Sequence, residues 1–88
     1  MHAVLVSVKI NDYDKARQEL TEQVVPRVSQ APGFVAGYWF EPAGDQGWSV
    51  VLFESEEAAQ AAADRIPAQP PENVTIQNVD VRGVVAHA

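Results

Sequence analysis

The sequence predicts an α+β domain in which four antiparallel strands form one sheet with two helices on one face, in the chain order βαββαβ. Four stretches with alternating β-branched or aromatic residues are typical of strands, and two stretches with apolar residues four positions apart are typical of helices. Right-handed crossovers in the two strand–helix–strand halves place both helices on the same face. The length of 88 residues fits one domain, residues 1–88.

The first strand is predicted over residues 3–10, where one of the two alternating phases is wholly β-branched. The first helix follows residues 11–14, whose short polar side chains accept hydrogen bonds from first-turn amides. Its apolar stripe comprises Ala16, Leu20, Val24 and Val28. Pro26 lies within this stripe and lacks an amide donor, so we expect a kink or a looser last turn near Val25. The helix ends at residues 31–33.

A hairpin is predicted next, with strands over residues 34–41 and 48–54 and a turn over residues 42–47 that is rich in glycine and polar residues. Ser55 is a favourable N-cap for the second helix, an alanine-rich segment that runs to Ile66.

The chain then enters the proline-rich loop 67–73, which cannot continue the helix. The last strand starts at Val74, and the apolar phase changes near Gln77 and Asn78, which predicts a bulge there.

Composition narrows the classes of partner. The chain has six basic and twelve acidic residues, a net charge of -6, and its basic residues form no run. Nucleic acid and anionic membrane surfaces both require a cationic face, so neither is expected as a partner. There is no cysteine, which excludes disulfides and cysteine-ligated zinc, and no segment of about 20 apolar residues is present. We expect a cytoplasmic protein without a metal site.

The hairpin predicts self-association because both of its faces are apolar. On strand two, one phase holds Phe34, Ala36, Tyr38 and Phe40, and the other holds Val35 and Trp39. On strand three, Trp48, Val50 and Leu52 oppose Val51 and Phe53. Two helices cover only one face, and a bare apolar face of this size is unusual for a monomer. We therefore expect a homodimer, with the apolar segment 83–88 as an arm along a partner's sheet edge.

Three stretches and the order of elements carry a family resemblance over the full length. The stretches read VPRVSQAPGF at 25–34, WSVVLFESEEA at 48–58 and VDVRGVV at 79–85. In these features the chain resembles the dimeric α/β-barrel superfamily and, within it, the small antibiotic-biosynthesis-monooxygenase-like proteins. The resemblance implies a ferredoxin-like fold, a homodimer whose two sheets form a barrel-like core, and a pocket between sheet and helices in each subunit.

The superfamily includes cofactor-free oxygenases and haem-degrading enzymes. The haem-degrading branch ligates iron through a histidine on the second helix, and this chain has none there, so that branch is a poor match. The oxygenase branch uses a pocket with tryptophan, asparagine, tyrosine and arginine. Tryptophans are present on the hairpin strands, whereas no asparagine or arginine maps onto a matching motif. The resemblance implies no bound cofactor.

Five residues are candidates for a substrate pocket: Tyr13, Tyr38, Trp39, Trp48 and Arg82. The two tryptophans either form a flat wall for a polycyclic aromatic ligand or pack in the core or a dimer interface. The tyrosines either present hydroxyls to the pocket or only pack their rings. Arg82 either clamps a substrate carboxylate or joins a cross-strand ion pair with Asp80 and Lys9.

Two functions remain open from the sequence. The first is a cofactor-free, monooxygenase-like enzyme that acts on an aromatic or quinol small molecule, with no catalytic residue identified. The second is a non-catalytic dimer that binds a small molecule or a protein partner. The two histidines, His2 and His87, lie at the chain ends. This position makes a histidine general base less favoured, and likewise a metal site formed by the two histidines.

Overall fold

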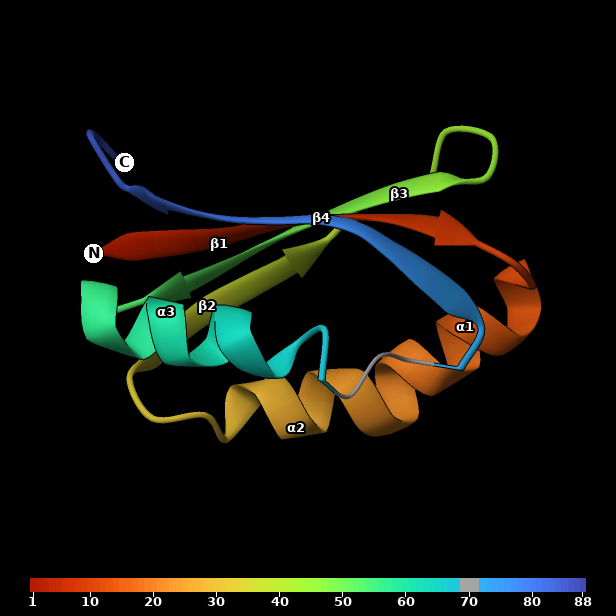
Figure 1. The fold of residues 1–88 in the computed structure, drawn as a ribbon, viewed down its shortest axis with the longest axis horizontal. Helices are drawn as coiled ribbons and strands as arrows, with labels where there is room; N and C mark the ends of the chain where they lie inside the picture. Colours follow the sequence, from red (N-terminus) through yellow and green to blue (C-terminus); the bar gives the residue numbers. More distant parts are fainter. Residues whose placement is uncertain (69–71) are drawn as a thin grey trace.

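The computed structural model describes residues 1–68 and 72–88 and has the predicted α+β fold. Its elements are β1 (His2–Ile10), α1 (Tyr13–Glu19), the π-helical turn η1 (Leu20–Val24), α2 (Val25–Ser29), β2 (Phe34–Trp39), β3 (Gln46–Phe53), α3 (Glu56–Arg65) and β4 (Val74–Gly83). The strands pair antiparallel in the order β2-β3-β1-β4, the order of a ferredoxin-like sheet. All helices lie on one face of this sheet, and the two chain ends lie at the same end of it (Figure 1).

The first helical layer, which is formed by α1, η1 and α2, changes from α-helical to π-helical winding before Pro26. Asp12 caps α1, its side chain accepting a hydrogen bond from the Lys15 amide at 3.1 Å. In the next turn the Val25 amide donates to the Leu20 carbonyl, five residues back. A proline ring clashes with the carbonyl four residues before it, and a wider turn gives that carbonyl room. The predicted disturbance is therefore present, but it precedes Pro26 and a regular α-helical segment follows it.

A bulge in β2 changes which residues share a face. The pairing with β3 shifts between Phe34 and Ala36, so Val35 is the extra residue. Phe34 consequently turns toward the helices, where its ring meets Phe53 edge-on with centroids 6.3 Å apart. The simple alternation in the sequence had placed Phe34 with Tyr38, on the other face, and that placement was wrong.

The bulge predicted in the last strand is confirmed. Pairing of β4 with β1 shifts between Ser7 and Val8, which leaves Gln77 as the extra residue. The predicted loop 67–73 is described only in part, because residues 69–71 lie outside the described residues. None of the helices in the described part of the chain is long and apolar enough to cross a membrane.

The core is small and lies beneath α3. Its buried cluster comprises Val4, Val6, Val51, Phe53, Ala59 and Ala63. Because alanine projects little beyond the backbone, α3 lies close to the sheet, and Ala59 is fully buried. In contrast, α1, η1 and α2 contain no fully buried residue. The first helical layer and α3 therefore cover the sheet unequally.

The sheet face opposite the helices, called the outer face below, is bare and apolar in the chain. It is formed by Ala3, Leu5, Ala36, Tyr38, Phe40, Trp48, Val50 and Leu52. Tyr38 and Phe40 are 55% and 54% exposed, and Trp48 is 45% exposed. No helix of the described chain lies over this face (Figure 1). The prediction of two apolar faces is confirmed.

Candidate functional site

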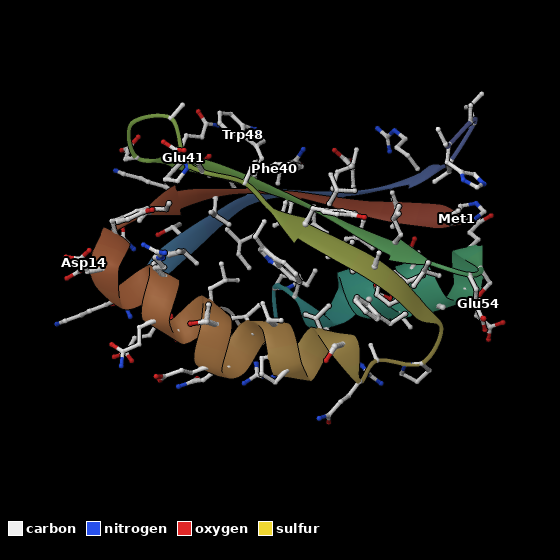
Figure 2. The ribbon with its side chains drawn as sticks, turned by 180° about the vertical axis from the view of Figure 1, so that it is seen from behind. Met1, Asp14, Phe40, Glu41, Trp48 and Glu54 are labelled. Atoms are coloured by element: carbon white, nitrogen blue, oxygen red, sulfur yellow. The ribbon has the colours of Figure 1, made fainter. Side chains whose placement is uncertain are left out.

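A cavity of about 930 Å³ lies between the sheet and the helical layer. Its floor is the helix-facing side of β1 and β3, and its opposite wall is the apolar stripe of the first helical layer, namely Ala16, Leu20, Val24 and Val28. Side chains of both layers project into the space between them (Figure 2). Ligand sites have volumes of about 300–1,000 Å³ and mostly apolar walls, so the cavity is large enough for a polycyclic small molecule.

Trp39 is the aromatic side chain that β2 contributes to this cavity. Its indole lies against Gly37, two residues earlier on the same strand face: a Cβ added at Gly37 would be 2.7 Å from Trp39 Cη2 and 2.8 Å from Cζ3. The missing side chain at position 37 therefore lets the ring lie along the strand. Sequence reasoning missed this role of Gly37, although a glycine in the middle of a strand often marks such a close approach.

The sheet separates the five candidate pocket residues. Tyr13, at the start of α1, and Trp39 line the cavity. Trp48 is also a lining residue of the cavity, although its pairing with Ser7 places its side chain on the outer face. Figure 2 shows Trp48 beside Phe40, pointing away from the helices. The two tryptophans therefore do not form one aromatic wall.

Tyr38 and Arg82 lie outside the cavity lining. Tyr38 is on the outer face, opposite Val50 in the register. The Arg82 guanidinium lies 3.7 Å from the Asp80 carboxylate on the same strand. Lys9 pairs with Thr75, too far along the ladder to join them, so the expected cross-strand ion pair is instead an ion pair along β4.

Three arginines that the sequence analysis did not select line the cavity: Arg17, Arg27 and Arg65. Each follows or precedes an apolar lining residue in the sequence. Their positions next to the apolar stripes of the helices are the sequence feature from which these arginines could have been predicted. Glu41, just after β2, is the carboxylate of the described lining.

The described lining includes no histidine or cysteine. Within residues 1–68 and 72–88, no group of three or more His, Cys, Asp or Glu side chains is placed to hold a metal ion. His2 lies at the sheet end, where its Nε2 is 3.6 Å from the Glu56 carboxylate and its Nδ1 is buried without a partner. The ionisable side chains of the described lining are those of Tyr13, Glu41 and the three arginines, and Ser49 adds a hydroxyl.

No family model matches the sequence, and no curated protein matches it. Two solved structures share its fold over the full length. One is a point variant of MhuD with two manganese protoporphyrin IX molecules bound per active site, at 18% identity and a TM-score of 0.66, covering 100% of this chain and 98% of that chain. The other is the haem degrader MhuD from Mycobacterium tuberculosis with two haems bound in its active site. It has 21% identity and a TM-score of 0.60, and the match covers 100% of this chain and 99% of that chain.

These matches define the class of the protein by its fold. The chain has a ferredoxin-like α+β fold, with its helices on one face of a four-stranded antiparallel sheet. More particularly, it has the fold of MhuD, which confirms the resemblance to antibiotic-biosynthesis-monooxygenase-like proteins at the level of the fold.

Proposed function

We propose that the protein binds a flat, largely apolar small molecule in the cavity between the sheet and the first helical layer. The observation that carries this proposal is the cavity itself, about 930 Å³ with apolar walls and the Trp39 indole among them. Aromatic rings bind polycyclic ligands by offset stacking and supply much of the contact area. The shared fold with MhuD, which binds porphyrins, supports a flat aromatic ligand of comparable shape.

The residues do not fit an iron porphyrin held through an imidazole. Helix α3 contains no histidine, and the described cavity lining contains none. The tyrosine hydroxyl of Tyr13 is the remaining lining group of a type that ligates haem iron, and Tyr13 is 46% exposed at the start of α1. A metal-free aromatic compound is therefore the ligand class that these walls favour.

Cofactor-free oxygenation is the second candidate function, and the three arginines of the cavity lining favour it. An acidic phenol or anthrone would lose a proton, and its anion would be stabilised by a nearby guanidinium. Reaction of the resulting carbanion with dioxygen converts a CH₂ carbon to a carbonyl, with one oxygen atom retained and the other released as water. Glu41, the carboxylate of the described lining, would take the proton. Binding remains the primary proposal because no histidine base lines the described cavity.

Fluorescence tests the binding proposal directly. In a Trp48→Phe variant, Trp39 is the only tryptophan, and titration with anthraquinone-2-carboxylate should give saturable quenching. A Trp39→Phe variant, which retains Trp48, is the matched control and should be quenched less, because the Trp48 side chain lies on the outer face. Equal quenching in the two variants, or none in the first, contradicts binding in this cavity. Dioxygen uptake with anthrone as substrate then separates binding alone from oxygenation.

The proposed assembly is a homodimer in which two outer faces pack together. Val50 lies at the centre of this face, opposite Leu5 on one side and Tyr38 on the other. A second sheet of the same kind would bury the exposed aromatic side chains, whereas a monomer would leave them in water. The two chain ends lie at one end of the sheet, where the 83–88 segment could extend along a partner (Figure 1).

Light scattering tests this assembly. The wild-type protein should have the mass of a dimer, and Val50→Lys should shift it to the monomer because a buried, unpaired ammonium is costly. Gln60→Lys, an identical charge change on the exposed side of α3, should remain dimeric. A monomeric wild-type protein, or dissociation of both variants, would refute the outer face as the interface.

A further inference from the structure

The charge of the cavity differs from that of the whole chain. The protein has twice as many acidic as basic residues, twelve against six. The described cavity lining has the opposite balance, with Arg17, Arg27 and Arg65 against the single carboxylate of Glu41. Half of the chain's basic residues therefore lie at this one site, although the protein as a whole is anionic.

The three arginines occupy equivalent places on the helices, two in the continuous helical segment of residues 13–29 and one in α3. Arg17 belongs to α1, Arg27 to α2 and Arg65 to α3. Each is exposed, and each is adjacent in sequence to an apolar lining residue. An arginine in such a place lays its aliphatic stem along the apolar wall and keeps its guanidinium in water. We therefore expect the charged groups at the rim of the cavity, above its apolar interior.

These guanidinium groups are available to a ligand. In the part of the chain that the structure describes, the ion pairs are His2 with Glu56 and Arg82 with Asp80. None of the guanidinium groups of the cavity arginines takes part in an ion pair or a hydrogen bond there. A guanidinium forms two parallel hydrogen bonds with a carboxylate, and such charge-assisted pairs are stronger than neutral ones.

We propose that the ligand of this cavity is an amphipathic anion, with a flat aromatic body inside and a carboxylate at the rim. This inference rests on the proposed binding function and adds the charge of the ligand to it. Arg17 and Arg27 are ten residues apart, about 15 Å along a helix. A single carboxylate therefore pairs with only one of them, and Arg65, on α3, is the third candidate.

A matched pair of probes tests the inference. Anthraquinone-2-carboxylate and its uncharged carboxamide have the same ring system, and quenching of Trp39 in the Trp48→Phe background measures the Kd of each. We expect the carboxylate to bind about tenfold more tightly, a difference of about 1.4 kcal/mol. Raising the salt concentration should weaken only the carboxylate complex, which provides a readout that requires no change to the arginines.

Substitution then locates the interaction. Arg17→Gln, Arg27→Gln and Arg65→Gln, made singly and together, should reduce the preference for the carboxylate, and the triple variant should bind both probes equally. Arg82→Gln removes the same charge from the outer face and should keep the tenfold preference. Circular dichroism confirms that each variant is folded.

Each outcome decides between the two proposals. Equal affinity of the wild-type cavity for the two probes overturns the inference about charge but leaves the binding proposal intact. The same loss in Arg82→Gln as in the cavity variants also overturns it, because the effect would then reflect net charge alone. Absence of quenching by both probes refutes the binding proposal and the inference with it.

Discussion

Substitution of Gly33 probes the contact that closes one end of the cavity. Gly33 follows the lining residues Ala31 and Pro32 and has a φ of 80°, in the left-handed region. A Cβ at this position would be 2.7 Å from the Cβ of Ala58 on α3, closer than real side chains approach. Its carbonyl accepts a hydrogen bond from the Glu54 amide at 2.8 Å, so the backbone is held in place.

The cost of Gly33→Ala has two parts. The left-handed conformation costs an alanine about 1–2 kcal/mol, and the overlap with Ala58 adds about 1–3 kcal/mol as overpacking. A domain of this size has a free energy of unfolding of about 4–13 kcal/mol. We therefore expect the Tm to fall by about 10 °C or more, measured by circular dichroism at one protein concentration.

Gly44→Ala is the matched control for this experiment. Gly44 also has a positive φ, 63°, but a Cβ there would meet nothing within 4 Å. This variant should lose only the conformational part, about 1–2 kcal/mol. Combining Gly33→Ala with Ala58→Gly should recover part of the loss, because the second change removes the atom that overlaps. If Gly33→Ala and Gly44→Ala have the same Tm, the close contact between the start of β2 and α3 is refuted.

Two further contacts yield predictions. The Glu19 carboxylate accepts hydrogen bonds from the backbone amides of Glu72, at 3.0 Å, and Asn73, at 3.3 Å, and so ties the first helical layer to the start of β4. Glu19→Gln should lower the free energy of unfolding in urea by about 0.5–1.5 kcal/mol, and an unchanged midpoint would show that this tie contributes nothing. Gly37→Ala should push the Trp39 indole away from the strand, which shifts its emission maximum and weakens probe binding in the Trp48→Phe background. Unchanged emission would contradict the packing of the ring on Gly37.

Local sequence patterns were sufficient for most of the fold. Residues 3–10 alternate with a β-branched phase, and Ser55 followed by alanines begins a helix; both elements are present as β1 and α3. The bulge at Gln77 was also predictable, because an extra residue reverses the apolar phase of the strand that contains it. The bulge at Val35 was not predictable, because every residue from Phe34 to Phe40 except Gly37 is apolar. When both phases of a strand are apolar, a change of phase is not visible in the sequence.

The candidate site was less predictable for a related reason. Trp39 and Trp48 are both aromatic residues on adjacent strands, and only the hairpin register decides whether they share a face. The register pairs Trp39 with Ser49, so Trp48 points to the opposite side. Arg17 and Arg27 are exposed helical residues, and nothing in their own chemistry distinguishes a cavity rim from an ordinary solvated helix surface.

The sequence by itself determined the order of strands and helices, the caps, the presence of a helix disturbance near Pro26 and the two apolar faces of the sheet, because these depend on periodicity and on neighbours within a few residues. Only the tertiary structure decided that α3 packs closely through Ala59 while the first helical layer leaves a cavity of about 930 Å³. Cavity volume and the facing of each side chain depend on the register of the sheet and on distances between segments far apart in the chain. Those distances are set by packing, which no local pattern contains.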